Sequence, residues 1–357
     1  WDMNGLSLEY ATDPKAWDLN QRGGFPALID YAWGGSYAMQ QHKGRSYITY
    51  IGGAGRGYEA VEKPLSIGIA STDKDIATAH PWACLDKPLM SYDDKDAQWW
   101  EQLTQYKSTV YRMDKSWLGE PYVMFYNAGG KDGTHPKGEL IGIALSKDMK
   151  KWKRYQGNPI FAHDTDGTIT GDAQIVWMPT PSLATNDKQN PTSRGIWVMY
   201  YFSAFNPSRE YNAYNTFAVS SDLIHWTDWN VADLIVPSKP YDEMFAHKSY
   251  VVKWKDTVYH FYCAVNNSGQ RGIAVATSTR KGKSEVQFPE PDPVGKRVVV
   301  SLNKEWEASL IPNFRGDAPA YEGNKNILSP RGEAGRRLLN VPFNLEDYYG
   351  THQGENG

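Results

Sequence analysis

The sequence predicts an all-β fold: a five-bladed β-propeller followed by a short C-terminal β extension of jelly-roll type. Aromatic residues, which favour strands, make up 13% of the 357 residues. A short apolar strand that ends near a Ser and an Asp recurs along the sequence, whereas helical periodicity is confined to residues 96–106. Four strand-rich units are visible, and a fifth blade completed from the two termini would close the ring.

The recurring strand sets the spacing of the blades. Its copies end at Asp73, Asp148, Asp222 and, in a degenerate form, Ser278. The first three lie 75 and 74 residues apart, and the second and third extend to Ser-x-Asp-x-x-x-Trp, ending at Trp152 and Trp226. A repeat of this length is typical of one supersecondary unit per copy.

Each copy follows two strand-like runs joined by a polar turn or a loop, which is the order of strands in a propeller blade. The paired runs are 36–39 with 46–51, 109–113 with 122–126, 173–177 with 196–202, and 249–254 with 257–262. We therefore expect residues 1–287 to form the propeller. Residues 288–357 would form a Pro-rich linker and a C-terminal β segment.

Composition excludes several classes of protein. With 38 basic and 41 acidic residues the net charge is −3, so neither nucleic acid nor an anionic membrane is an expected partner. No apolar run reaches the roughly 18 residues of a membrane span. Cys84 and Cys263 are too few for a disulfide framework or a cysteine metal site, although one bridge between them stays open. The 14 Trp and 23 Tyr fit a β core and equally a sugar binder, whose aromatic faces stack on sugar rings.

These repeats resemble the five-bladed propeller glycosidases, nearest in pattern to glycoside hydrolase families 43, 32 and 130. The passage 126–133 followed by 141–148 looks like their blade-to-blade connection, and the likeness spans residues 30–282. The tail is similar to the start of the sugar-binding jelly roll of family 2 glycosidases, at 302–306 and 341–345. The resemblance implies a glycoside hydrolase with a shortened sugar-binding domain behind it.

The resemblance also implies catalytic residues. Glycoside hydrolysis needs two carboxyl groups that flank one bond, and family 43 adds a third carboxylate that orients the others. Its order of Asp, Asp and Glu matches Asp30 as the base, Asp172 as the orienting residue and Glu243 as the acid. Met and Phe beside Glu243 would desolvate it, as an acid requires. Each of the three also fits an ordinary turn or surface position, and Asp242 competes with Glu243.

Other residues could bind the substrate. His247 and Lys248 follow Glu243, and Lys107 holds the equivalent position in the second blade. The predicted substrate-binding residues are Trp33, Lys107, His135, His247, Lys248 and Arg271. Their cationic members would bind hydroxyl groups or the carboxylate of a uronic acid. Metal-ligand spacings are absent, so no cofactor is predicted, although related propellers imply a structural calcium ion.

We therefore expect an exo-acting glycoside hydrolase whose substrate is a side chain of a plant or algal oligosaccharide or polysaccharide. A base at Asp30 that activates water would invert the anomeric centre. The alternatives are a non-catalytic carbohydrate-binding propeller of a larger glycosidase, or a polysaccharide lyase that uses Tyr or His. Because the sequence starts at Trp1 rather than at a Met, we expect a secreted or periplasmic protein whose signal peptide has been removed.

Overall fold

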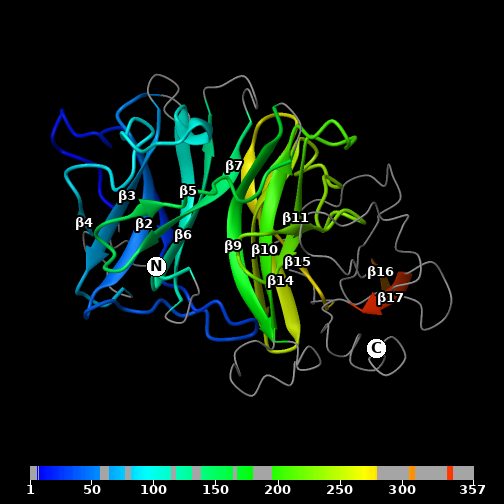
Figure 1. Ribbon diagram of the computed structural model, residues 1–357. Coiled ribbons are helices and arrows are strands. Elements are labelled where there is room, and N and C mark those ends of the chain that lie inside the picture. The colour runs from blue at the N-terminus through cyan, green and yellow to red at the C-terminus, as the bar shows by residue number, and fades with distance from the viewer. Residues whose placement is uncertain are drawn as a thin grey trace, which may run out of the picture. The chain divides into compact units, whose positions relative to one another are not determined.

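The computed structural model of the protein is all-β (Figure 1). It describes residues 6, 8–56, 64–76, 82–113, 118–130, 138–163, 167–179, 195–279, 305–309 and 336–340. The protein divides into two compact units. The first comprises Trp1–Tyr31, Ser36–Ala173 and Phe205–Ser208, and the second comprises Ala32–Gly35, Gln174–Ala204 and Arg209–Gly357.

Two four-stranded antiparallel sheets form the first unit, and both have the strand order of a propeller blade. One consists of β1 (Gln21–Pro26), β2 (Ser46–Gly53), β3 (Ser66–Thr72) and β4 (Ala83–Cys84). The other consists of β5 (Thr104–Arg112), β6 (Tyr122–Gly129), β7 (Leu140–Ser146) and β8 (Lys153–Arg154). A 3-10 helix, Trp99–Glu101, precedes β5 and is the helical part of the stretch that the sequence marked at 96–106.

Two further sheets follow along the sequence, one with four strands and one with three. One consists of β9 (Ile169–Pro179), β10 (Gly195–Ala204), β11 (Ala213–Ser220) and β12 (Thr227–Asp228). The other has three strands, β13 (Phe245–Trp254), β14 (Thr257–Val265) and β15 (Arg271–Thr277). In the predicted C-terminal segment, β16 (Glu305–Ser309) pairs antiparallel with β17 (Arg336–Asn340). The all-β propeller prediction is thus confirmed with four blades among the described residues, and the fifth blade and the jelly roll stay predictions.

The first blade begins earlier than the sequence predicted. The partner of β2 is β1, not the run 36–39, which lies in the connection between β1 and β2. Two adjacent glycines, Gly23 and Gly24, lie in β1, and a Cβ at Gly23 would lie 3.1 Å from the Ile51 side chain. Glycine is disfavoured in strands, so β-propensity misses a strand that contains two of them.

The repeated Ser-x-Asp-x-x-x-Trp motif is a turn. Ser146 Oγ accepts hydrogen bonds from the backbone N–H groups of residues 148 and 149, and Asp148 Oδ1 accepts them from residues 150 and 151. These backbone donors lower the pKa of Asp148. Ser220 and Asp222 repeat the pattern. The aspartates that reveal the repeat therefore shape the outer turns of the blades.

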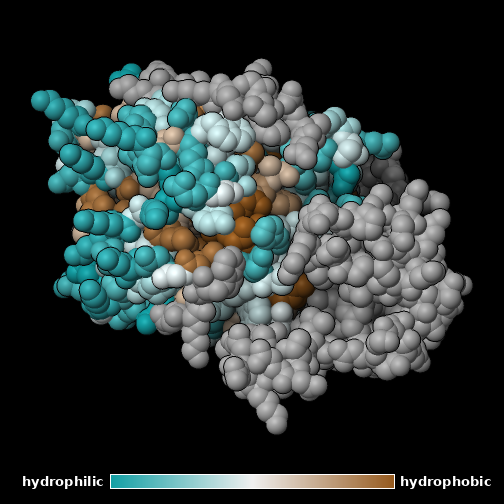
Figure 2. Space-filling model, viewed as in Figure 1, coloured by the Kyte–Doolittle hydropathy of each residue, from teal (hydrophilic) through white to brown (hydrophobic). Residues whose placement is uncertain are grey.

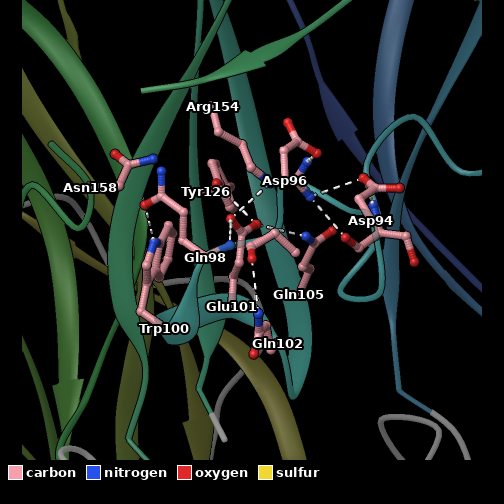
Figure 3. A network of polar contacts seen from close by, with 12 residues as sticks. Asp94, Asp96, Gln98, Trp100, Glu101, Gln102, Gln105, Tyr126, Arg154 and Asn158 are labelled. Atoms are coloured by element: carbon pink, nitrogen blue, oxygen red, sulfur yellow. Dashed lines mark hydrogen bonds and ion pairs between the residues drawn. The ribbon is translucent and has the colours of Figure 1, made fainter. Parts of the chain in front are cut away.

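A buried ionic network holds β8 against the 3-10 helix in the first unit (Figure 3). Arg154 donates from Nε to Glu101 Oε1 at 2.8 Å, and its two Nη atoms reach Asp96 at 2.8 Å and Asp94 at 3.0 Å. Glu101 is fully buried. Its carboxylate oxygens also accept hydrogen bonds from the Tyr126 hydroxyl, a glutamine side chain and a backbone N–H. Burial raises the pKa of Glu101, and Arg154 opposes this shift. Both oxygens of this buried carboxylate are hydrogen-bonded, so its role is structural.

In the second unit, a buried histidine lies within the core between the last two blades. His260 is 1% exposed, and its ring lies 6.4 Å from that of Tyr200. Its Nε2 has no hydrogen-bond partner among the described residues. Burial lowers the pKa of His260 to about 3, so the imidazole is neutral in the folded protein at pH 7.

One face of the three-stranded sheet is exposed and apolar. Ile69 and Ile143, in the Gly-Ile-Ala copies of the first two blades, are 5% and 0% exposed, whereas the equivalent Ile273 of β15 is 80% exposed. Val275 and its cross-strand partner Phe261 are also exposed on this face. Figure 2 shows hydrophobic surface where Figure 1 labels β14 and β15. This blade therefore has one face that the described residues leave uncovered.

The two cysteines are free thiols in the structure, so the disulfide that the sequence left open is not formed. Among the described residues, no helix has the length and apolar character needed to cross a membrane.

The substitution Arg154→Met tests the buried network. It leaves Glu101 buried without its cation, and we expect the free energy of unfolding to fall by about 3–5 kcal/mol. Adding Glu101→Gln should recover part of this loss, because the unpaired buried charge is removed. Chemical denaturation measures both effects, with Lys153→Met at the exposed neighbouring position as the control. Equal losses for Arg154→Met and Lys153→Met would contradict the structural role.

The buried histidine predicts a pH dependence of stability. Between pH 6.5 and about 3 the unfolded state binds a proton at His260 that the folded state does not, so stability is lost as the pH falls through this range. From pH 7 to pH 5 this contribution amounts to about 2 kcal/mol. We expect His260→Phe to reduce the difference in unfolding free energy between pH 7 and pH 5 by that amount. The exposed His225→Phe serves as the control, and an unchanged pH dependence in His260→Phe would refute the assignment.

Candidate active site

A buried ion pair joins the inner strands of two blades in the first unit. Lys107 Nζ lies 3.9 Å from Asp172 Oδ2 and 3.5 Å from the Asp172 carbonyl oxygen. The side chains are 13% and 8% exposed. Lys107 also lies over the ring of Phe25, 5.8 Å from its centroid. A buried carboxylate is costly without a counter-charge, and Lys107 supplies one to Asp172 at this position.

Irregular backbone places both members of the pair. The register of β5 shifts between Gln105 and Ser108, a β-bulge that contains Lys107. Asp172 has a φ of +59°, which is a left-handed conformation that Asp tolerates better than most residues. A bulge re-aims a side chain relative to the regular pleat. In the second unit, the pairing of β13 with β14 also shifts register, between His247 and Tyr250.

A second carboxylate is connected to Asp172 through a buried amide. Asn127, at 2% exposure, accepts a hydrogen bond at Oδ1 from the Asp172 backbone N–H, at 3.3 Å. Its Nδ2 donates to Glu139 Oε2 at 2.5 Å. Glu139 lies just before β7 and is half-buried. Its backbone bonds to the start of β9, since its N–H donates to Thr168 O and its carbonyl accepts from the Thr170 N–H. The first unit therefore brings two carboxylates and one cation to one end of its strands.

Sequence reasoning missed Glu139. It belongs to a Lys-Gly-Glu-Leu run without a recognisable motif, ahead of a third strand where no carboxylate was sought. The usable signal was Asn127, a polar residue at the end of the apolar run 122–126. A buried amide at a strand end requires partners for both of its polar atoms.

The predicted base Asp30 closes a local turn. Its Oδ2 accepts hydrogen bonds from the backbone N–H and the hydroxyl of Ser36, at 2.9 and 2.8 Å. Its own N–H donates to the carbonyl oxygen of Ala38. These contacts are those of the turn cap that the sequence allowed as the alternative.

The predicted acid Glu243 lies in the second unit and is exposed. Its Oε2 accepts a hydrogen bond from Asn267 Nδ2 at 2.8 Å. The desolvation expected from its Met and Phe neighbours does not occur, because the side chain points into solvent. The adjacent Asp242 is fully buried and accepts from two backbone N–H groups and from the Tyr262 hydroxyl. Asp242 therefore closes the turn that precedes β13.

The other predicted binding residues have varied surroundings. In the second unit, His247 is buried, and its Nδ1 lies 3.1 Å from the Cys263 carbonyl oxygen, to which it donates. Lys248 is exposed, with a φ of +59° and its Nζ 5.8 Å from the Phe202 centroid. Arg271 is exposed at the start of β15.

Trp33 packs in the second unit rather than standing free as a binding platform. Its ring lies 6.0 Å from that of Tyr200, and its backbone N–H donates to the Trp177 carbonyl oxygen. The side chain is partly buried against the core of this unit. His135 lies outside the described residues.

Among the described residues, no group of three or more His, Cys, Asp or Glu side chains is arranged to hold a metal ion. The ionisable side chains that the structure brings together at this site are Asp172, Glu139 and Lys107. Two carboxyl groups held near one another can donate and accept protons in turn.

Comparison with known proteins supplies the family. A solved structure described as a complex of BT0996 with RGII is 63% identical to this protein, with a TM-score of 0.70, and the match covers 78% of this sequence and 75% of that one. Another, described as "Glycoside hydrolase", is 61% identical with a TM-score of 0.71, over 80% of this sequence and 76% of that one. No protein-family model and no curated sequence matches. The numbered family thus stays a prediction, whereas identity of this degree over most of both sequences shows that the protein belongs to the glycoside hydrolases.

Proposed function

We propose that this glycosidase cleaves a sugar from an oligosaccharide related to RGII, with the carboxyl groups of Asp172 and Glu139 as the acid/base pair. The observation that supports this most is the buried Lys107–Asp172 pair joined through Asn127 to Glu139. The substrate rests on the similar structure described as a complex with RGII. The side-chain substrate and the exo action expected from the sequence are part of the proposal.

The proposal gives the two carboxylates different roles. Asp172, beside the cationic Lys107, is assigned as the base or nucleophile. Glu139, which is half-buried and held by Asn127 at 2.5 Å, is assigned as the acid.

In the proposed reaction, Glu139 transfers its proton to the glycosidic oxygen as the bond from that oxygen to the anomeric carbon breaks. The leaving sugar departs as an alcohol. Water completes the reaction by adding its oxygen to the anomeric carbon, and the carboxylates take up the proton that it releases. No cofactor enters these steps, in line with the sequence expectation, and the secreted or periplasmic location is likewise part of the proposal.

Matched substitutions decide between this pair and the triplet inferred from family 43. We expect Asp172→Asn and Glu139→Gln each to lower kcat by about 10²–10⁴, because each removes one proton-transfer group. Asp30→Asn and Glu243→Gln are the matched changes at positions with a turn cap and an exposed side chain, and their losses should be far smaller. Initial rates of sugar release from RGII oligosaccharides measure all four.

The triplet assignment predicts the reverse for the two glutamates: full loss in Glu243→Gln and little change in Glu139→Gln. That result would refute the proposed pair. Binding of these glycans without any release of sugar by the unmodified protein would instead support the non-catalytic carbohydrate-binding alternative. An unsaturated product that absorbs ultraviolet light would identify a lyase.

A further inference from the structure

The loop after β10 presents an exposed aromatic ring in the same unit as Asp172. Phe205 directly follows β10, is 53% exposed and has a φ of +55°, which is unusual for a bulky residue. The segment Phe205–Ser208 belongs to the first unit, as Asp172 does. Such a conformation costs about 1–3 kcal/mol and persists only where the surroundings hold it. Core packing does not explain it, because more than half of the ring faces solvent.

The course of β10 places this ring at the same strand end as Asp172. β10 neighbours β9 in their sheet, and Gly195, at the start of β10, lies directly against Met178, near the end of β9. A Cβ at Gly195 would lie 2.6 Å from the Met178 carbonyl oxygen. β10 therefore runs back along β9 and ends level with the first residues of β9. Asp172 is the fourth residue of β9, so the loop follows β10 at the end of the sheet that carries the carboxylate.

Two oriented polar side chains adjoin Phe205. Asn206 Oδ1 accepts from the Ser208 backbone N–H at 3.0 Å and from its hydroxyl at 2.7 Å. This fixes the amide, whose Nδ2 lies 3.4 Å from His163 Nδ1. An amide Nδ2 can only donate, so His163 Nδ1 accepts this hydrogen bond. The ring of His163 packs edge-on against buried Phe161, with centroids 5.9 Å apart.

We infer that Phe205, Asn206 and His163 form a sugar-binding subsite for the unit adjacent to the sugar that is cleaved. A sugar ring has an apolar C–H face and a rim of hydroxyl groups, which match an exposed aromatic face flanked by oriented polar groups. Phe205 stacks on the C–H face, and Asn206 and His163 supply polar groups for the hydroxyl rim. The inference rests on the proposed function, because it takes the neighbouring carboxylates as the point of cleavage.

Kinetics and binding with an RGII oligosaccharide test the subsite. We expect Phe205→Ala to raise KM and the Kd from calorimetry by about tenfold, with kcat within a few-fold, because ring stacking holds a sugar remote from the bond that breaks. Phe205→Trp should retain affinity, because it keeps an aromatic face. His163→Phe keeps the packing on Phe161 and removes the polar ring nitrogens, so it should weaken binding as well. Trp254→Ala is the control, since Trp254 is an exposed aromatic residue at the hairpin between β13 and β14.

The outcomes separate this inference from the proposed function. Turnover with an unchanged Kd and KM in Phe205→Ala would overturn the subsite and leave the function standing. Binding that weakens in Phe205→Ala, in a protein that releases no sugar, would support the subsite and contradict the function. An oligosaccharide that is neither bound nor cleaved by the unmodified protein would overturn both. A thermal unfolding curve for each variant verifies that it is folded.

Discussion

A carboxylate that is removed from water must be given a counter-charge or hydrogen-bond donors, and this constraint shapes the first unit of the protein. Asp18, Glu101 and Asp172 are buried there, and the surroundings of Glu101 and Asp172 differ most clearly. Around Glu101, an arginine, a tyrosine, a glutamine and a backbone N–H occupy both oxygens. Around Asp172, one lysine lies 3.9 Å from one oxygen. Both oxygens of Glu101 are thus occupied by donors. The Asp172 carboxylate can still accept hydrogen bonds from a substrate or a water molecule.

This difference distinguishes the roles of the acidic residues better than their position in the sequence does. The saturated carboxylate of Glu101 holds a helix and a strand together. Asp148 and Asp222 of the repeats are engaged by backbone N–H groups, and Asp242 by backbone groups and a tyrosine. Asp172 combines burial, a cation and few direct donors, and these are properties of a carboxylate that takes part in chemistry.

The backbone irregularities belong to the same arrangement. A regular strand points alternate side chains to opposite faces of its sheet, so two neighbouring inner strands would not aim Lys107 and Asp172 at each other by default. The bulge in β5 and the left-handed residue in β9 change these directions at one end of the strands. The hydrogen bond from the Asp172 N–H to Asn127 then fixes the second carboxylate nearby. The loop with Phe205 adds a third departure from regular backbone at this end of the β9–β10 sheet.

From the sequence alone, the all-β class and the blade repeat could be predicted, because strand propensity and the recurring turn motif are local properties. The catalytic role of Asp172 stays a prediction. The glycosidase class followed from a resemblance carried by the same repeats. The start of the first blade could not be predicted, since β1 contains two glycines that propensity counts against a strand. The partners of the carboxylates were also decided only by tertiary structure. Lys107, Asn127, Glu139 and Asp172 come from four separate parts of the sequence, and only strand register and buried hydrogen bonds bring them together. The same physics places Asp30 in a turn and Glu243 in solvent, because burial and register depend on neighbours that are distant in sequence.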